Sequence, residues 1–212
     1  MDKTEIAVNI FNTCAREYQD RFMEVDLYHN ALDIFCNTIA KQNAEILELA
    51  CGPGNITQYV LQERPGFKIL GTDLAPNMIE LAKTNNPSAG FQLMDCRDIL
   101  SLHKKYDGII CGFALPYLSK TAAGKLFADA FEALHPNGTL YISTMEETQD
   151  NKSGFKNSSD GQYRAYVYYH KADHLIRSLE KNGFNILYFH RQDYPATDGT
   201  KTVDLLIIAQ KP

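Results

Sequence analysis

The stretch ILELACGPGNIT, residues Ile46–Thr57, decides the fold, because an apolar strand pattern runs into a glycine turn and then into a helical pattern. Glycine has no Cβ, so Gly52 and Gly54 let the backbone pass close to a ligand. The amides that follow point out of a helix N-terminus. Glu48 is unusual, since buried parallel strands are mostly apolar. An acid there repels a pyrophosphate and attracts a cation, so we expect a ligand that carries a positive charge near this turn.

Acidic residues also follow the next two predicted strands. Asp73 ends the second strand and lies 19 residues after Gly54, close to the spacing at which a carboxylate meets ribose hydroxyls in nucleotide-binding βαβ units. Asp95 follows the third strand. Ligands of open α/β sheets bind at the carboxyl ends of the strands. Glu48, Asp73 and Asp95 are therefore predicted to converge on one ligand.

The remaining pattern predicts a single α/β domain over residues 1–212. The later strands are expected over residues 67–73, 90–94, 106–112, 139–144, 184–192 and 202–210, with helices over 119–135 and 171–182. The last two strands are joined by residues 193–200, which leave no room for a crossover helix, so they should pair antiparallel. The predicted fold is a doubly wound, mostly parallel seven-stranded sheet that closes with a C-terminal antiparallel hairpin.

Composition argues against several classes of protein. The 21 Lys and Arg against 26 Asp and Glu give a net charge of −5, which offers no basic surface for nucleic acid. We see no run of transmembrane length and no secretory signal, and expect no membrane association and a cytoplasmic location. The five cysteines are scattered without a Cys-x-x-Cys pair, which indicates free thiols. His170 and His174 have helical spacing but lack a third ligand nearby in sequence, so no metal is expected.

Three segments together resemble class I S-adenosylmethionine-dependent methyltransferases of the small-molecule type. They are Glu48–Asn55, Asp73–Met78 and the pair Asp95-Cys96, and the resemblance covers about residues 15–211. It implies the Rossmann-like methyltransferase fold, with S-adenosylmethionine as cofactor and S-adenosylhomocysteine as product. The implied reaction moves a methyl group to O, N or S of a small molecule by in-line displacement. We expect no nucleic-acid partner, and a monomer or homodimer.

The resemblance also implies a set of cofactor-binding residues. Its members would be Tyr18, Glu48, Ala50, Gly52, Gly54, Asp73, Leu74, Met78, Asp95, Cys96 and Phe113. Glu48 would help to hold the methionyl ammonium, together with a carbonyl of Gly112 or Phe113. Ala50 and the two glycines would shape the wall against the methionine and the ribose.

The nucleoside end of the cofactor has its own implied contacts. Asp73 would accept both ribose hydroxyls, and Leu74 and Met78 would flank the adenine. Asp95 would receive the exocyclic amine, while the Cys96 amide would donate to the ring.

Each of these roles has a structural alternative. Glu48 can brace the glycine loop, and Asp73 can cap the helix that follows it. Asp95 and Asp98 can both cap the next short helix, which is the only role that we expect for Asp98. Met78 can be ordinary helix core.

Two segments are predicted to flank the ligand edge without being needed for the sheet. Residues 1–30 are expected to contain lid helices, with Tyr18 either reaching the cofactor or packing within an aromatic face. Residues 146–169 form an inserted segment on the substrate side, in which residues 151–161 read as a loop and 163–169 as an extra strand.

Alternation along this extra strand places Tyr166 and Tyr168 on one face. Together with Tyr117 they are the predicted substrate-binding residues, although both faces of the strand can equally be cover for the sheet.

The sequence does not assign a catalytic residue. A sulfonium methyl group is already activated, so positioning the two reactants supplies most of the rate and no base is required. Tyr117, Glu146 and His170 are the candidate bases near the expected pocket, and His170 is equally read as a residue at a helix start. The segment after Gly112 lacks the Asn of the Asn-Pro-Pro-Tyr box of nucleic-acid amino-methyltransferases.

Two other classes of protein fit parts of the pattern. A nicotinamide-dependent oxidoreductase shares the Gly-x-Gly turn and the following acid, but Thr57 stands where its third glycine belongs and Glu48 would oppose a pyrophosphate. A catalytically silent regulator that binds S-adenosylmethionine would have the same pocket residues as an enzyme.

Overall fold

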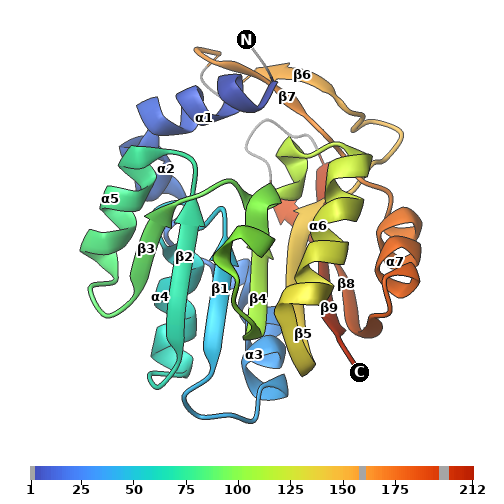
Figure 1. Ribbon diagram of the computed structural model, residues 1–212. Coiled ribbons are helices and arrows are strands. Elements are labelled where there is room, and N and C mark those ends of the chain that lie inside the picture. Colours follow the sequence, from blue (N-terminus) through green and yellow to red (C-terminus); the bar gives the residue numbers. More distant parts are fainter. Residues whose placement is uncertain (1–2, 158–160, 196–200) are drawn as a thin grey trace.

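The computed structural model describes residues 3–157, 161–195 and 201–212, and its centre is a seven-stranded sheet in the order β3-β2-β1-β4-β5-β9-β8 (Figure 1). The strands are β1 (Glu45–Leu49), β2 (Lys68–Asp73), β3 (Gly90–Leu93), β4 (Tyr106–Gly112), β5 (Leu134–Met145), β8 (Asn185–Pro195) and β9 (Lys201–Gln210). β1 to β5 pair in parallel, whereas β9 is antiparallel to both β5 and β8. The predicted fold class and its closing antiparallel hairpin are confirmed.

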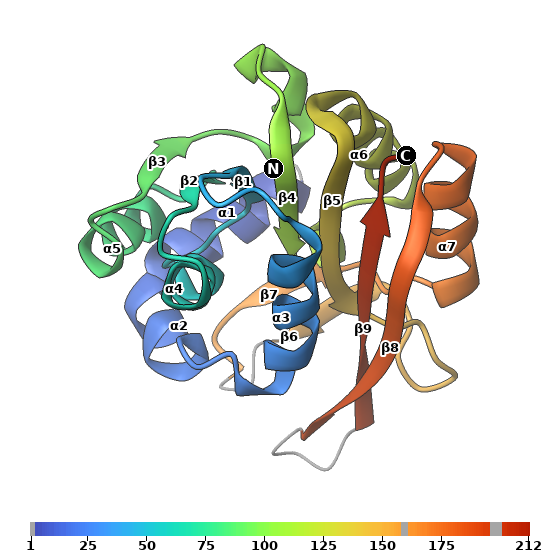
Figure 2. The ribbon, with the colours of Figure 1, turned by 90° about the horizontal axis from the view of Figure 1, so that it is seen from below.

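Helices cover both faces of this sheet (Figure 2). α3 (His29–Thr38) and α4 (Asn55–Glu63) pack on one face, where Phe35 and Val60 join Ile46 and Tyr141 in a buried cluster. The other face carries α6 (Lys120–Ala133) and α7 (Ala172–Lys181) over a second cluster. α5 (Pro76–Asn85) packs beside β3. Burial on both faces explains why β1 and β4 read as apolar runs.

The strand order reverses between β1 and β4, and this determines where a ligand can bind. β1 pairs with β2 on one side and with β4 on the other, so the crossovers leave β1 and β4 in opposite directions. A crevice forms at such a switch point, outside the carboxyl ends of the strands. The sheet therefore presents the ends of β1 and β4 to a shared cavity.

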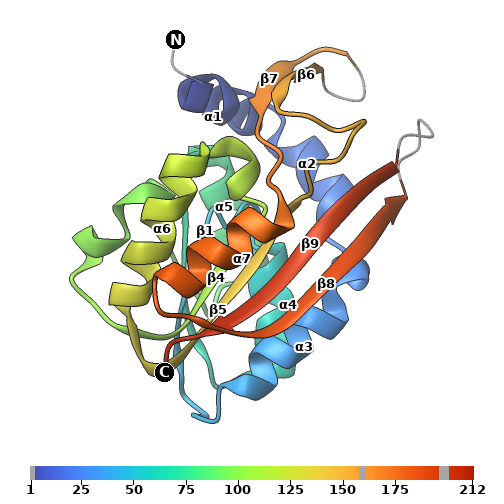
Figure 3. The ribbon, with the colours of Figure 1, turned by 90° about the vertical axis from the view of Figure 1, so that its right-hand side faces the viewer.

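Segments from distant parts of the chain lie over this carboxyl edge (Figure 3). They are α1 (Lys3–Thr13), α2 (Ala15–Phe22), the 3₁₀ turn η1 (Asp26–Tyr28) and a small antiparallel sheet of β6 (Gly154–Asn157) and β7 (Arg164–Val167). α1 packs against β7 and α5. The N-terminal helices were predicted to lie over the carboxyl edge of the sheet, and the inserted segment lies over the same edge.

The prediction of a loop over residues 151–161 is wrong for β6. The Gly, Ser and Asn content of residues 151–161 favours a loop, but the β-forming residues of β7 provide a pairing partner for residues 154–157. Phe155 and Tyr166 lie opposite each other, with ring centroids 5.3 Å apart in an edge-on arrangement. Residues 158–160 of the predicted loop lie outside the described residues.

Several element ends differ from the predictions. α6 ends at Ala133 as its His-Pro-Asn-Gly stop signal indicates, but β5 already begins at Leu134. Its pairing with β4 shifts register between Tyr106 and Gly108, and Asn137 in this stretch has a φ of 63°. The last two strands are longer than expected, and residues 196–200 between them lie outside the described residues. Within the described ranges, no helix has both the length and the apolarity needed to cross a bilayer.

Candidate functional site

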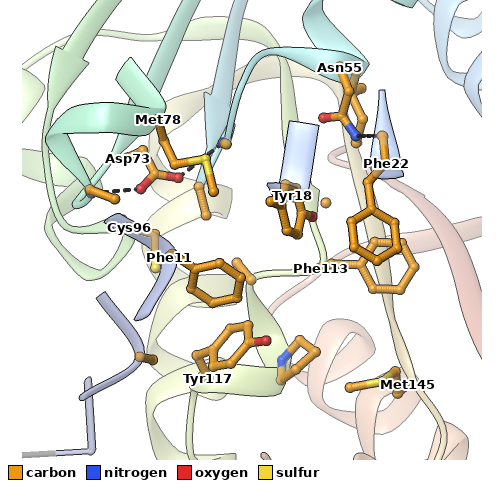
Figure 4. Close-up of a pocket in the computed structure, with 18 of the residues that line it drawn as sticks. Phe11, Tyr18, Phe22, Asn55, Asp73, Met78, Cys96, Phe113, Tyr117 and Met145 are labelled. Atoms are coloured by element: carbon orange, nitrogen blue, oxygen red, sulfur yellow. Dashed lines mark hydrogen bonds between the residues drawn. The ribbon is translucent and has the colours of Figure 1, made fainter. Parts of the chain in front are cut away.

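A cavity of about 760 Å³ lies between the carboxyl edge of the sheet and the segments that cover it (Figure 4). Its walls include most of the residues that the sequence predicts for cofactor binding. These are Tyr18, Ala50, Gly52, Asp73, Leu74, Met78, Asp95, Cys96 and Phe113. Tyr117 from the predicted substrate set also lines the cavity. Glu48, Gly54, Tyr166 and Tyr168 do not.

The glycine turn after β1 is held open by Asp73 at the end of β2. Asp73 Oδ2 accepts a hydrogen bond from the Gly52 amide at 3.0 Å, and its Oδ1 accepts one from the Ala75 amide at 2.8 Å. Ala50 and Gly52 have φ values of 52° and 53°, in the left-handed region. The turn therefore presents its backbone to the cavity with Asp73 beside it.

Asp73 retains capacity for a ligand. A carboxylate offers about four lone-pair sites, and the backbone amides of Ala75, Gly52 and Leu74 use three of them. Burial raises the pKa of Asp73, and the hydrogen bonds from Ala75 and Gly52 oppose that rise. The N-cap of α5 is Ala75 and not Asp73. Of the predicted capping role, Asp73 keeps only the hydrogen bond that it accepts from the Ala75 amide.

Gly54 has a packing role. A Cβ on Gly54 would lie 2.4 Å from Asn86 Nδ2 and 3.4 Å from Ala82. The amide group of Asn86 donates to the Gly54 carbonyl at 2.9 Å. Gly54 allows α4 to approach α5, and the structure places it behind the cavity wall.

Glu48 lies beneath the glycine turn and is 1% exposed. Its carboxylate accepts a hydrogen bond from the hydroxyl of Thr57, the residue that replaces a third glycine. Burial raises the pKa of Glu48 to about 8, although the Thr57 hydrogen bond acts in the opposite direction. These contacts match the loop-bracing alternative, and a contact between Glu48 and an ammonium group stays a prediction.

Asp95, which follows β3, forms an ion pair with Arg97 that sequence reasoning missed. Asp95 caps the 3₁₀ helix η2 (Cys96–Leu102) by accepting from the Arg97 amide at 2.9 Å, and it also binds the Arg97 side chain. Burial raises the pKa of Asp95, but the Arg97 contacts outweigh it and lower the pKa overall. The prediction that Asp98 is a cap is wrong, because Asp98 lies inside η2 at non-helical angles.

Aromatic side chains from the N-terminal helices close the cavity on the side opposite the sheet edge (Figure 4). Phe11 of α1 meets Tyr18 and Tyr117 edge-on, at centroid distances of 5.7 and 5.1 Å. The ring centroids of Phe22 and Tyr18 are 4.7 Å apart. Asn55 donates to the Phe22 carbonyl at 2.9 Å, which ties the end of α2 to the glycine turn. Phe11 and Phe22 were missed because their helices show no ligand pattern.

A second polar pair lines the cavity between η1 and β9, and sequence reasoning missed it as well. Tyr28 Oη donates to Asp204 Oδ2 at 2.8 Å, and the Tyr28 ring lies 5.3 Å from that of Phe113. Asp204 is 2% exposed, and it pairs with Met145 of β5 in the sheet register. Burial raises the pKa of Asp204 to about 6, against the opposing effect of the Tyr28 hydrogen bond.

The predicted substrate tyrosines of the inserted segment lie elsewhere. Tyr166 and Tyr168 are 4.7 Å apart and contact Lys3 of α1, whose Nζ is 3.4 Å from the centroid of the Tyr166 ring. This contact joins the inserted segment to the N-terminal helix above the cavity, so the two tyrosines contribute to the cover. Substrate binding by Tyr166 and Tyr168 stays a prediction.

Two of the three candidate bases are also displaced from the cavity. Glu146 accepts two hydrogen bonds from the guanidinium of Arg191, at 2.7 and 2.8 Å. His170 is fully buried, with Nε2 2.9 Å from the Leu115 carbonyl, and its burial lowers its pKa. Only Tyr117 of the three lines the cavity. Across residues 3–157, 161–195 and 201–212, no group of three or more His, Cys, Asp or Glu side chains is arranged to hold a metal ion.

Comparison with known proteins is consistent with this geometry. The family described as "Methyltransferase domain" matches residues 46–138, the segment that contains the glycine turn, Asp73 and Asp95. Residues 46–138 are thus similar to this methyltransferase domain family. The match ends within β5, before Met145 and Asp204, so these two cavity residues lie outside it.

Other similar proteins are methyltransferases as well. A malonyl-[acyl-carrier protein] O-methyltransferase of Priestia megaterium is 32% identical over 140 residues, which cover 63% of this chain and 49% of that protein. A trans-aconitate 2-methyltransferase of Variovorax paradoxus is 28% identical over 57% of this chain and 46% of its own length. The chain thus spans about half the length of these curated relatives.

A solved structure shows the same fold. The 1,6-didemethyltoxoflavin-N1-methyltransferase of Burkholderia thailandensis, crystallised with 1,6-didemethyltoxoflavin and S-adenosylhomocysteine, superposes with a TM-score of 0.73. It is 20% identical, and the match covers 98% of this chain and 88% of that one.

Proposed function

We propose that this chain transfers the methyl group of S-adenosylmethionine to O, N or S of a small molecule. The observation that carries the proposal is the joint placement of the Gly52 amide and the Asp73 carboxylate at the mouth of the cavity. A close-approaching backbone turn next to a carboxylate with a free lone pair suits a ribose and an amino-acid chain. In the proposed arrangement, residues 1–212 act as one domain, with residues 1–30 as lid and 146–169 on the substrate side.

The cofactor would be held by residues of the first four strands. Asp73 would accept the ribose hydroxyls, and Leu74 and Met78 would flank the adenine, with the Cys96 amide donating to the ring. Asp95 would accept the exocyclic amine through lone pairs that Arg97 leaves open. Ala50 and Gly52 would contact the methionine chain, with Tyr18 above it and the Phe113 or Gly112 carbonyl at its ammonium.

The bound cofactor supplies a methyl group that is already activated on a sulfonium. The protein then has to hold an acceptor in line and to exclude water, which accounts for about 7–11 kcal/mol of the barrier in well-oriented reactions. The aromatic cover of Phe11, Phe22 and Tyr117 serves both purposes. We further propose that the acceptor is not a nucleic acid and that the protein works in the cytoplasm as a monomer or homodimer.

The structure gives little support to a nicotinamide-dependent oxidoreductase. Thr57 stands where the third glycine of a nicotinamide-binding turn belongs, and its hydroxyl donates to the buried Glu48 beneath the turn. A thermal-shift panel separates these two functions. S-adenosylhomocysteine should raise the unfolding midpoint, whereas NAD and NADP should not. The opposite result would refute the proposal.

A silent regulator that binds S-adenosylmethionine needs a different test. Incubation of the protein with a metabolite extract and S-adenosylmethionine carrying a labelled methyl group should yield a labelled small molecule. Binding of S-adenosylhomocysteine without any labelled product would favour the regulator.

A further inference from the structure

The cavity has two walls of different character. The cofactor residues proposed above come from the ends of β1 to β4 and from α2. A second wall is built by η1 and by the strands beyond β4, and it carries two acids, Asp26 of η1 and Asp204 of β9. Its members include Tyr28, Met145 and Asp204, and it adjoins the ring of Phe113, whose carbonyl is proposed for the cofactor. No residue that η1, β5 or β9 contributes to this wall has a role in the cofactor arrangement, so this wall is free to contact the acceptor.

Asp204 is the buried acid of this second wall, whereas Asp26 is exposed and its Oδ1 lies 3.4 Å from His29 Nε2. Oδ2 of Asp204 is occupied by the Tyr28 hydroxyl at 2.8 Å, and its Oδ1 accepts no hydrogen bond from any residue that the structure describes. Asp204 forms no ion pair within the same residues. A buried acid without a full set of partners is costly, and this one lines a cavity. The open oxygen is therefore suited to a hydrogen-bond donor of a bound molecule.

The groups around Asp204 leave it as an acceptor. Tyr28 reaches it from η1 and donates to it, and the neighbouring titratable groups on β5 and near β7 are the neutral phenols Tyr141 and Tyr169. Tyr188 and Tyr194 of β8 are further phenols in this surrounding. The pKa of Asp204, about 6, leaves the carboxylate ionised at neutral pH. No described cation competes for its open oxygen.

The apolar part of the wall defines the shape of the molecule. The rings of Tyr28 and Phe113 lie 5.3 Å apart and, with Met145, form the surface around Asp204. Aromatic and thioether side chains favour planar, apolar ligands. We propose that the acceptor is a planar aromatic molecule whose ring N–H or hydroxyl donates to Oδ1 of Asp204, with Tyr28 as the residue that positions this carboxylate.

This inference rests on the proposed function and specifies its substrate class. During transfer, the N–H or O–H bond of the acceptor breaks and its proton passes to Asp204 Oδ1. The electron pair so released forms the bond to the methyl carbon, and the pair of the broken carbon–sulfur bond stays on sulfur. Tyr28 keeps Asp204 ionised until then, because its hydrogen bond stabilises the charged form.

A binding experiment tests this without knowledge of the natural acceptor. Indole and 1-methylindole have nearly the same shape, but only indole has an N–H. Their dissociation constants are measured by calorimetry on protein saturated with S-adenosylhomocysteine at pH 7.5. Indole is expected to bind about tenfold more tightly, as a hydrogen bond to a charged group predicts. Equal affinities, or no binding of either probe, would overturn the inference.

Variants locate the effect at Asp204. Asp204→Ala should abolish the preference for indole, and Asp204→Asn should reduce it while preserving the packing around the site. Asp193→Asn is the matched control, because Asp193 is an exposed acid of β8 that does not line the cavity, and it should keep the full preference. A preference retained in Asp204→Asn and Asp204→Ala alike would refute the assignment.

The cofactor site is tested separately in the same proteins. Each Asp204 variant should bind S-adenosylhomocysteine within about twofold of the unmodified protein. A tenfold loss would instead place Asp204 in the cofactor site and overturn the inference. Failure of the unmodified protein to bind S-adenosylhomocysteine would refute the proposed function itself, which is a distinct outcome. Tyr28→Phe should raise the pKa of Asp204 and move the acid limb of any methyl-transfer pH profile upward.

Discussion

Asp73 Oδ2 accepts a hydrogen bond from the backbone amide of Gly52 at 3.0 Å, so the end of one strand fixes the turn that follows its neighbour. The same carboxylate is the group that we propose for the ribose. Its position thus serves both the conformation of the empty turn and the binding of the cofactor, and its removal should affect both.

Asp73→Ala should weaken binding of S-adenosylhomocysteine by about 1–3 kcal/mol, the cost of unpaired hydroxyl groups in the complex. It should also lower the free energy of unfolding, because the Gly52 and Ala75 amides lose their acceptor. Asp73→Asn keeps one acceptor oxygen and should show a smaller loss of both. Calorimetry and urea unfolding measure the two effects, and unchanged affinity in Asp73→Ala would remove Asp73 from the site.

Gly52 and Gly54 should respond differently to the same substitution. Both have positive φ, so alanine costs about 1–2 kcal/mol of backbone strain at either position. The Cβ of Gly52→Ala meets only Tyr18, at 3.7 Å, and intrudes on the cavity, so affinity for S-adenosylhomocysteine should fall. Gly54→Ala collides with Asn86 and should lose about 1–3 kcal/mol more stability through overpacking.

Unfolding midpoints and calorimetric affinities of the two glycine variants, compared side by side, check this difference. A larger loss of affinity in Gly54→Ala than in Gly52→Ala would contradict the placement of the turn.

Glu48 should make stability depend on pH. Its pKa is raised from 4.5 to about 8 on folding, so the folded state binds the proton more tightly. The free energy of unfolding should therefore fall as the pH rises through this interval. The raised pKa of Asp204 lowers the free energy of unfolding in the same way, but only up to about pH 6. The lowered pKa of His170 makes the free energy of unfolding rise with pH, and only below about pH 6.5.

The interval from pH 6.5 to 8 thus reports on Glu48. Chemical unfolding of the unmodified protein and of Glu48→Gln across that interval should show a decline in the first and a flatter profile in the second. Thr57→Val should extend the decline to higher pH, because it removes the hydrogen bond that lowers the pKa of Glu48. Identical profiles for the unmodified protein and Glu48→Gln would show that Glu48 does not titrate there.

Cys96 should act through its backbone. Cys96→Ala keeps the amide that is expected to contact the adenine ring, so affinity for S-adenosylhomocysteine should change by less than about 0.5 kcal/mol, as for a conservative substitution. Asp95→Ala removes the proposed acceptor for the exocyclic amine and should weaken binding by about 1–3 kcal/mol. Calorimetry with S-adenosylhomocysteine and with its inosine analogue, which lacks the exocyclic amine, checks whether Asp95 accepts a hydrogen bond from that amine.

The sequence predicts well which residues of the first four strands line the cavity, and it misses those that η1 and β9 contribute. Gly52, Asp73 and Asp95 follow strands with clear apolar patterns, and the geometry of a parallel sheet brings such positions to one edge. Tyr28 and Asp204 are 176 residues apart, and neither stands in a local pattern that marks a ligand. Only the pairing register of β9 with β5 brings Asp204 beside Met145.

Local composition also misled the prediction at one place and left it incomplete at another. Residues 154–157 have the composition of a loop but become a strand because β7 offers a pairing edge. Asp95 caps η2, which is one of its two predicted roles, but its side chain also holds the Arg97 guanidinium, an ion pair that the order of residues alone does not specify.

The direction of β9 has a consequence for how such a domain can diversify. β9 runs antiparallel to β5, so the first residues of β9 lie at the edge where the parallel strands end. The last residues of β8 lie at the same edge, because β8 is antiparallel to β9. Asp204, Thr202 and Tyr194 all belong to this one hairpin. With the proposed roles, exchange of Tyr194, Thr202 and Asp204 would give the domain a new choice of acceptor while the glycine turn and its proposed nucleoside contacts stay as they are.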